Sequence, residues 1–206
     1  MSVWDKYGNW DEIARLKSVE DVKSMITGRK KAWRPNFCPP ALAYIFDYAM
    51  EEFKAEHDAT PTALDFGCGL GRNGPLLRKF FPDVIGVDLP EMVDRLNDEL
   101  PIHASENYRE VYRSMTTLVK EEEFCLLYDS VAFQHFVDVG YISEIIDMLS
   151  SIKSFRTFVS VHKYSEQRRP AHIGVLQEKG WDVWHTESET LSFEGVIHSL
   201  ITLRRW

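Results

Sequence analysis

Cysteine is scarce in this chain of 206 residues, and the little there is forms no recognisable pattern. The cysteines are Cys38, Cys68 and Cys125, and no two of them have the CxxC spacing. An odd number of widely separated cysteines predicts neither a disulfide framework nor a zinc site. We therefore expect a reducing, cytoplasmic compartment.

Positive charge is also in short supply. The chain has 24 Lys and Arg against 32 Asp and Glu, a formal net charge of −8. Nucleic-acid binding depends largely on neutralising phosphates with Lys and Arg, so this balance argues against a nucleic-acid partner. The seven histidines form no His-x-x-x-His pair, and no metal is expected.

Long apolar runs are missing as well. No run approaches the ~20 residues that span a bilayer. The first residues lack the basic segment followed by an apolar segment that marks a secretory signal. Both observations favour a cytoplasmic protein without membrane contact, and they leave its oligomeric state open.

What the chain does have is a regular alternation of apolar segments with helical ones. Strands are expected near 62–66, 84–88, 110–115, 124–128 and 155–161, with two more near 181–186 and 198–205. This alternation predicts an α/β fold with a mostly parallel sheet and helices on both faces. Residues 60–206 are expected to form this domain, with 1–59 as a helical extension that includes a helix from Ser18 to Gly28.

The most informative segment begins at the first of these strands. Asp65 ends an apolar run and is followed by glycines at every second position, Gly67, Gly69 and Gly71. A second apolar run ends at Asp88. The pattern predicts a strand, a glycine loop, a helix starting near Arg72 and reaching Phe80, and a strand tipped by a carboxylate, an arrangement typical of sites for adenosine-containing cofactors.

These residues resemble motifs I and II of the class I S-adenosylmethionine (SAM)-dependent methyltransferases. The resemblance implies a Rossmann-like, seven-stranded, mostly parallel sheet closed by an antiparallel carboxyl-terminal hairpin. It also implies that SAM is the cofactor and S-adenosylhomocysteine (SAH) the product. The residues that it places around the cofactor are Asp65, Gly67, Cys68, Gly69, Gly71, Asp88, Leu89 and Met92.

Individual roles follow from chemistry as well as from the resemblance. Asp88 has two acceptor oxygens that match the two hydroxyls of a ribose, although an aspartate before Pro90 also suits a helix N-cap. Asp65 suits the cationic amino group of the methionine moiety. Leu89 and Met92 are expected to line the adenine site, and residues 114–117 would also contact the adenine. Cys68 is equally well explained as a small apolar filler.

A dinucleotide-binding fingerprint is the competing interpretation. Gly69, Gly71 and Gly74 spell G-x-G-x-x-G, and Asp88 follows Gly69 by nineteen positions. Three features favour the methyltransferase. Asp65 would repel a pyrophosphate, the loop lies far into the chain, and the chain after Asp88 is short for a second nucleotide-binding half with a substrate domain.

The segment after the fourth expected strand resembles methyltransferase motif IV. Its candidate catalytic residues are Asp129, at the strand end, and His135. A histidine there suits a general base, but a packing histidine explains it equally well. Cys125 stands where many relatives have an acid, so no acidic role is carried over to it.

The expected reaction is transfer of the sulfonium methyl group to a small-molecule nucleophile. Positioning and desolvation can supply most of the rate enhancement, so a base is optional. A protein that binds SAM without turnover is the second possibility, because binding and transfer use separable residues.

Overall fold

The computed structural model describes residues 40–130, 132, 139–163, 169–187 and 198–204, together with Ser18 and Glu20. The helix expected between Ser18 and Gly28 lies almost wholly outside these residues, as does His135.

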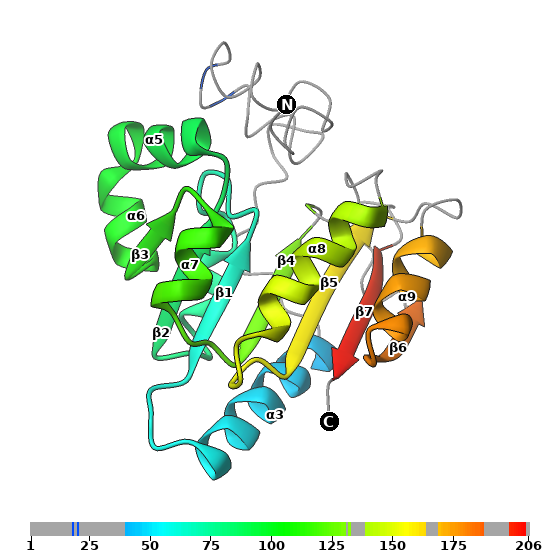
Figure 1. Cartoon of the computed structure of the whole chain (residues 1–206). Helices are drawn as coiled ribbons and strands as arrows, with labels where there is room; N and C mark the ends of the chain where they lie inside the picture. The colour runs from blue at the N-terminus through cyan, green and yellow to red at the C-terminus, as the bar shows by residue number, and fades with distance from the viewer. Residues whose placement is uncertain are drawn as a thin grey trace.

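The core of the molecule is a sheet with the strand order β3-β2-β1-β4-β5-β7-β6 (Figure 1). The first five strands in this order run parallel, whereas β7 is antiparallel to both β5 and β6. An α/β fold with a parallel sheet is therefore confirmed. The strand bounds are β1 Thr62–Phe66, β2 Asp83–Val87, β3 Glu110–Tyr112, β4 Leu126–Ser130, β5 Thr157–Lys163, β6 Asp182–Glu187 and β7 His198–Arg204.

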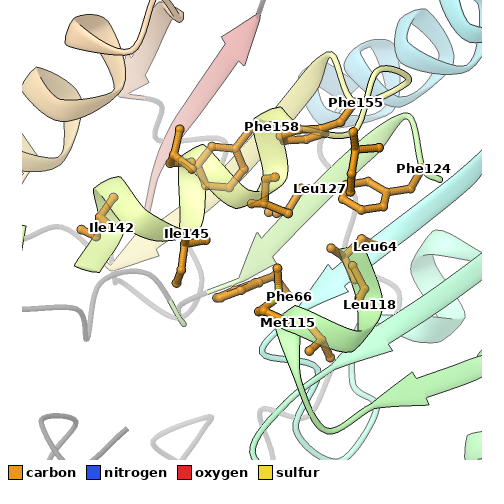
Figure 2. Close-up of a cluster of buried hydrophobic side chains, with 14 of the residues drawn as sticks. Leu64, Phe66, Met115, Leu118, Phe124, Leu127, Ile142, Ile145, Phe155 and Phe158 are labelled. Carbon is orange, nitrogen blue, oxygen red and sulfur yellow. The ribbon is translucent and has the colours of Figure 1, made fainter. Parts of the chain in front are cut away.

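Helices cover both faces of this sheet. Buried side chains of α7, α8 and α9 pack with Leu64 and Phe66 of β1 in one apolar cluster, part of which Figure 2 shows. Those of α3, α4, α5 and α6 pack with Ala63 in a second cluster on the other face. The helix bounds are α3 Pro40–Glu56, α4 Gly74–Leu77, α5 Pro90–Glu99, α6 Pro101–Asn107, α7 Met115–Glu121, α8 Val139–Ser150 and α9 Arg169–Glu178.

The alternation of side chains along a strand decides which face each polar residue of the site occupies. Ala63 lies in the second cluster and Leu64 in the first, so Asp65 projects toward the face of α3 to α6. Along β4, Leu126 and Tyr128 belong to that same face, while Leu127 and Asp129 belong to the face of α7 to α9. Two of the three expected site carboxylates, Asp65 and Asp129, therefore lie on opposite faces of the sheet.

The segments around the expected site differ from the sequence prediction in length. The helix after the glycine loop begins at Gly74 and ends at Leu77, so it is shorter than predicted. Turns fill the interval between Leu77 and Asp83, where β2 begins. In these turns the Arg78 and Phe81 amides donate backbone hydrogen bonds. Strand β3 ends at Tyr112 rather than near residue 115.

A helix that the sequence did not predict, α6, follows α5 directly. Pro101 lacks an amide hydrogen and fixes its own φ angle, so it suits the first position of a new helix but not the interior of an old one. Leu100 accordingly leaves the helical conformation, with φ −133° and ψ 47°, before α6 begins. This break turns α6 so that it can pack beside the glycine loop.

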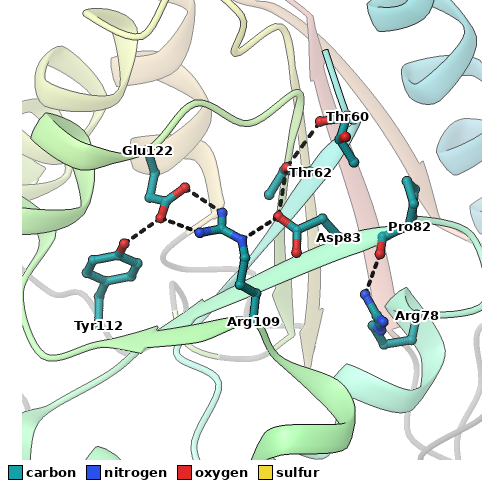
Figure 3. Close-up of polar contacts among 8 residues, drawn as sticks. All are labelled: Thr60, Thr62, Arg78, Pro82, Asp83, Arg109, Tyr112 and Glu122. Carbon is teal, nitrogen blue, oxygen red and sulfur yellow. Dashed lines mark hydrogen bonds and ion pairs between the residues drawn. The ribbon is translucent and has the colours of Figure 1, made fainter.

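Polar contacts join β2, β3 and α7 away from the glycine loop (Figure 3). The Arg109 guanidinium donates to Asp83 Oδ2 over 2.8 Å and to the two Glu122 oxygens over 2.9 and 2.6 Å. The Tyr112 hydroxyl also donates to Glu122. These contacts connect the segment between α6 and β3 to the start of β2 and to the residue after α7.

Candidate functional site

The expected site lies at the carboxyl ends of β1 and β2. The strand order runs from β1 outward through β2 and β3 on one side and through β4 and β5 on the other. The chain therefore reverses its direction across the sheet between β1 and β4. Open α/β sheets bind ligands at such a switch point, outside the carboxyl ends of the strands.

The glycine loop has a backbone that only glycine adopts readily. Gly67, Gly69 and Gly71 have φ angles of 68°, 55° and 83°, all in the left-handed region. Close approach adds a second constraint, because a Cβ on Gly67 would lie 2.4 Å from the Cβ of Ala132. The loop after β1 thus touches the segment after β4, and the alternating glycines of the sequence are needed for backbone shape.

Asp88 ties this loop to the tip of β2. Its Oδ2 accepts the Gly69 amide at 2.5 Å, and its Oδ1 accepts the Leu89 amide at 2.7 Å. Burial raises the pKa of the Asp88 carboxyl to about 6, although these amides oppose the rise. The N-cap alternative for Asp88 is wrong, because Leu89 is the residue that precedes α5 at the cap position.

Asp65 is fully buried, and both its oxygens accept hydrogen bonds within the protein. Asn73 Nδ2 donates to Oδ1 over 3.0 Å, and the Tyr108 hydroxyl donates to Oδ2 over 2.7 Å. Burial raises the pKa of this carboxyl to about 6, and the two donors and Arg72 oppose the rise. Asp65 therefore supplies a negative charge behind the loop rather than an exposed oxygen.

This buried charge gives a prediction for stability. The Asp65 pKa lies above its ordinary value of 3.8 in the folded protein, so the folded state binds the proton more tightly than the unfolded state. The contribution of Asp65 to the free energy of unfolding then falls as pH rises from 3.8 to about 6, by ~1.4 kcal/mol per pH unit. Asp65→Asn is expected to stabilise the protein by about 3 kcal/mol at pH 8 and by little at pH 4.

Urea unfolding of both proteins at several pH values measures this difference. Asp94→Asn serves as the control, because Asp94 is exposed and pairs with Arg113 at the surface. A wild-type protein that is as stable as Asp65→Asn at pH 8 would contradict the prediction.

The apolar candidates are buried beside the loop. Cys68, Leu89 and Met92 have 3%, 5% and 2% of their surface exposed. Burial raises the pKa of the Cys68 thiol, and the nearby Asp88 and Asp65 raise it further, so this thiol stays protonated and unreactive.

Asp129, the candidate at the end of β4, is also fully buried. Its Oδ1 accepts the Ala132 amide at 2.7 Å, and its Oδ2 accepts the Ser160 hydroxyl. The carboxylate therefore holds the start of the segment after β4, next to Gly67. Across the switch point, Arg72 Nη2 donates to Ser130 Oγ over 2.6 Å.

Several polar side chains that support the loop were missed by sequence reasoning. They come from α6 and the residue after it, where His103 contacts Gly71 and Tyr108 contacts Asp65. Their segment shows no motif, and the contacts depend on where α6 packs. The one indication of such partners is Asp65 itself, because a buried carboxylate requires hydrogen-bond donors.

Among the residues that the structure describes, no group of three or more His, Cys, Asp or Glu side chains could hold a metal ion. In the same ranges, every helix is too short or too polar to cross a bilayer.

Solved structures resemble this chain, whereas no protein-family model and no curated protein matches it. The magnesium protoporphyrin IX methyltransferase of Synechocystis PCC 6803, solved with SAM, is 17% identical, with a TM-score of 0.61 over 98% of this chain and 97% of that protein. A SAM-dependent methyltransferase of Leishmania major is 15% identical, with a TM-score of 0.62 over 97% and 83%. An N-methyltransferase of Bradyrhizobium japonicum WM9, solved with SAH, is 12% identical, with a TM-score of 0.60 over 97% and 98%.

The fold is therefore similar to that of solved SAM-dependent methyltransferases, as the resemblance of the motifs implies. SAM or SAH is bound in several of these similar structures. The dinucleotide alternative is not supported. Its pyrophosphate needs the dipole of a helix after the loop, and α4 has only four residues.

Proposed function

We propose that this protein is a methyltransferase that moves the sulfonium methyl group of SAM to a small-molecule nucleophile. The main observation behind this proposal is the hydrogen bond from the Gly69 amide to the Asp88 carboxylate. It connects the glycine loop, with its left-handed φ angles, to the tip of β2. This contact places a carboxylate beside a loop whose glycines leave the backbone open to close approach by a ligand. The similar folds that hold SAM or SAH agree with it.

The residues around the loop fit the parts of SAM. Each Asp88 oxygen accepts one backbone amide and keeps a further lone pair for one ribose hydroxyl. The Asp65 charge favours the cationic end of the cofactor through space, with Gly67, Cys68, Gly69 and Gly71 as the surface between them. Leu89 and Met92 are the proposed walls of the adenine site.

SAM supplies an activated methyl group whose departure leaves neutral SAH. The protein then has to align the acceptor and exclude water. We assign the acceptor side to the segment after β4, where Asp129 orders Ala132 and where His135 is the proposed base. The net charge favours a small molecule over nucleic acid. The cytoplasmic location inferred from the cysteines stays a prediction.

Ligand-induced stabilisation tests the cofactor assignment. A ligand present at 100 times its dissociation constant stabilises a protein by about 2.7 kcal/mol. SAM and SAH are therefore expected to raise the melting temperature, while NAD at the same concentration should not. A shift with NAD alone would overturn the proposal. Release of SAH with a panel of amine, hydroxyl and carbon nucleophiles then separates an enzyme from a protein that binds SAM without turnover.

The amino-terminal residues are proposed to complete the acceptor site. Helix α3 packs with the sheet through Leu42, Phe46, Ala49 and Phe53, so it belongs to the core of the domain. Residues 1–39 precede it and lie outside the described ranges except for Ser18 and Glu20. They contain Trp4, Trp10 and Trp33, aromatic side chains that need either burial or a ligand.

Removal of residues 1–39 is predicted to leave SAM binding intact and to abolish methyl transfer. The shortened protein keeps α3 and should still melt cooperatively, which calorimetry checks before any activity is measured. Full transfer activity in a folded, shortened protein would show that the aromatic side chains of this segment only pack against the domain.

A further inference from the structure

The glycine loop is held from behind by side chains that come from outside the motif. Tyr108, which follows α6, donates its hydroxyl to Asp65 Oδ2 over 2.7 Å. Asn73, from the loop itself, donates to Asp65 Oδ1 over 3.0 Å. The acid at the start of the loop is thus fixed by one donor from the loop and one from a segment 43 residues away.

His103 makes the second connection, to the far end of the loop. Its Nε2 lies 3.0 Å from the Gly71 carbonyl oxygen, and its Nδ1 lies 2.9 Å from Asn107 Nδ2. Asn107 Nδ2 also donates to the His103 carbonyl oxygen over 2.7 Å, which identifies it as the amide nitrogen. Because Nδ1 must then accept, Nε2 carries the proton and donates to Gly71.

Helix α6 and Tyr108 pack so closely against the loop that the facing positions, 71 and 74, must be glycines. A Cβ on Gly71 would lie 3.0 Å from the His103 ring. A Cβ on Gly74 would lie 2.6 Å from Asn107 Cβ and 3.0 Å from Tyr108 Cζ. The backbone of the loop therefore lies directly against His103, Asn107 and Tyr108, and Gly74 is explained by this packing rather than by a dinucleotide.

We propose that His103 and Tyr108 are positioning residues that hold the glycine loop in the shape that accepts the cofactor. The proposal rests on the proposed function, because it assigns these residues to the same SAM site. Tyr108 fixes the start of the loop through Asp65, and His103 fixes its end through the Gly71 carbonyl. Between these two points lies Gly69, whose amide is bonded to Asp88.

Plain packing is the competing interpretation, since a buried tyrosine hydroxyl needs a hydrogen-bond partner wherever it lies. The two interpretations differ in what happens when a hydroxyl or a ring donor is removed and the shape is kept. Substitution of a packing residue would change the overall stability alone. Substitution of a positioning residue would change the motion of the loop and the affinity for SAM.

Tyr108→Phe and His103→Leu are the variants that remove the donors, and His103→Gln keeps an amide donor for the Gly71 carbonyl. Loss of a buried bond to a charged group should weaken SAM binding ~10-fold in Tyr108→Phe. Hydrogen exchange of residues 66–74 should become faster in Tyr108→Phe and His103→Leu. His103→Gln should recover most of the affinity that His103→Leu loses.

Tyr112→Phe is the matched control. Tyr112 is also a buried tyrosine that donates to a carboxylate, but its partner is Glu122 (Figure 3). Its ring packs on the opposite face of the sheet from Tyr108. This variant should keep both the loop exchange and the SAM affinity of the wild-type protein. Its unfolding free energy shows what the loss of a tyrosine hydroxyl does elsewhere.

The pH dependence of SAM binding supplies another measurement. The Tyr108 hydroxyl lowers the pKa of Asp65, whose surroundings also contain Arg72, Asp88, Cys68 and Tyr128. As the pH is lowered, the SAM affinity of Tyr108→Phe should begin to fall at a higher pH than that of the wild-type protein. The reason is that Asp65 has a higher pKa without this hydrogen bond. The two proteins differ only in the Tyr108 hydroxyl, so the shift of the curve of SAM affinity against pH measures the effect of this hydroxyl.

Unchanged loop exchange and unchanged SAM affinity in a folded Tyr108→Phe would overturn the proposal. Equal affinities of His103→Leu and His103→Gln would overturn the part that concerns His103, and this pair decides the question if Tyr108→Phe does not fold. If the wild-type protein fails to bind SAM but loop exchange accelerates in the variants, the positioning role stands and the proposed function fails.

Discussion

Asp88→Ala is expected to weaken SAM binding by ~30-fold to 1,000-fold, which corresponds to about 2–4 kcal/mol. Two effects combine in this variant. The proposed ribose hydrogen bonds to an ionised carboxylate disappear, and bonds of this kind are the stronger ones. In addition, the Gly69 amide loses its acceptor, so the loop loses its connection to β2. Calorimetric titration of the purified protein measures the loss directly.

Asp88→Asn separates the two effects. Its single carbonyl oxygen can still accept the Gly69 amide, but its amide group cannot accept a second ribose hydroxyl. We expect an intermediate affinity for this variant. Asp94→Ala is the control in the neighbouring helix α5, where the carboxylate pairs with Arg113 at the surface. If Asp88→Ala folds and binds SAM as the wild-type protein does, Asp88 does not bind the ribose.

The glycine loop was predictable from the sequence because its cause is local. Left-handed φ angles are a property of single residues, and the spacing of Gly67, Gly69 and Gly71 reports them directly. The parallel sheet was predictable for a similar reason, since buried strands such as β1 and β4 read as short apolar runs. Asp88 at the tip of β2 follows from where such a run ends.

The partners of Asp65 were not predictable, because they depend on tertiary contacts. Tyr108 and His103 reach the loop only after Pro101 has ended α5 and started α6, and the direction of α6 is set by packing. The short helix α4 has the same origin, since its length depends on the entry into β2. The resemblance pointed Asp65 toward the cofactor, but burial and two donors keep its oxygens inside the protein.

Gly67→Ala is expected to abolish detectable SAM binding, although it adds only a methyl group. The new Cβ would lie 2.4 Å from Ala132 Cβ, so the loop after β1 and the segment after β4 must move apart. Such a movement changes the backbone on both sides of the switch point between β1 and β4. The left-handed φ of 68° adds strain of roughly 1–2 kcal/mol.

Gly180→Ala controls for the strain, because Gly180 has a φ of 80° and a Cβ there would have no atom within 4 Å. It should lower the stability by a similar ~1–2 kcal/mol and leave SAM binding unchanged. Ala132→Gly combined with Gly67→Ala removes the clashing atom and should restore part of the affinity. If Gly67→Ala binds SAM normally, or if the double variant binds no better than the single one, contact between these two segments does not shape the cofactor site. Partial rescue would instead show that the close approach of Gly67 to Ala132, and not the left-handed backbone alone, makes this glycine necessary.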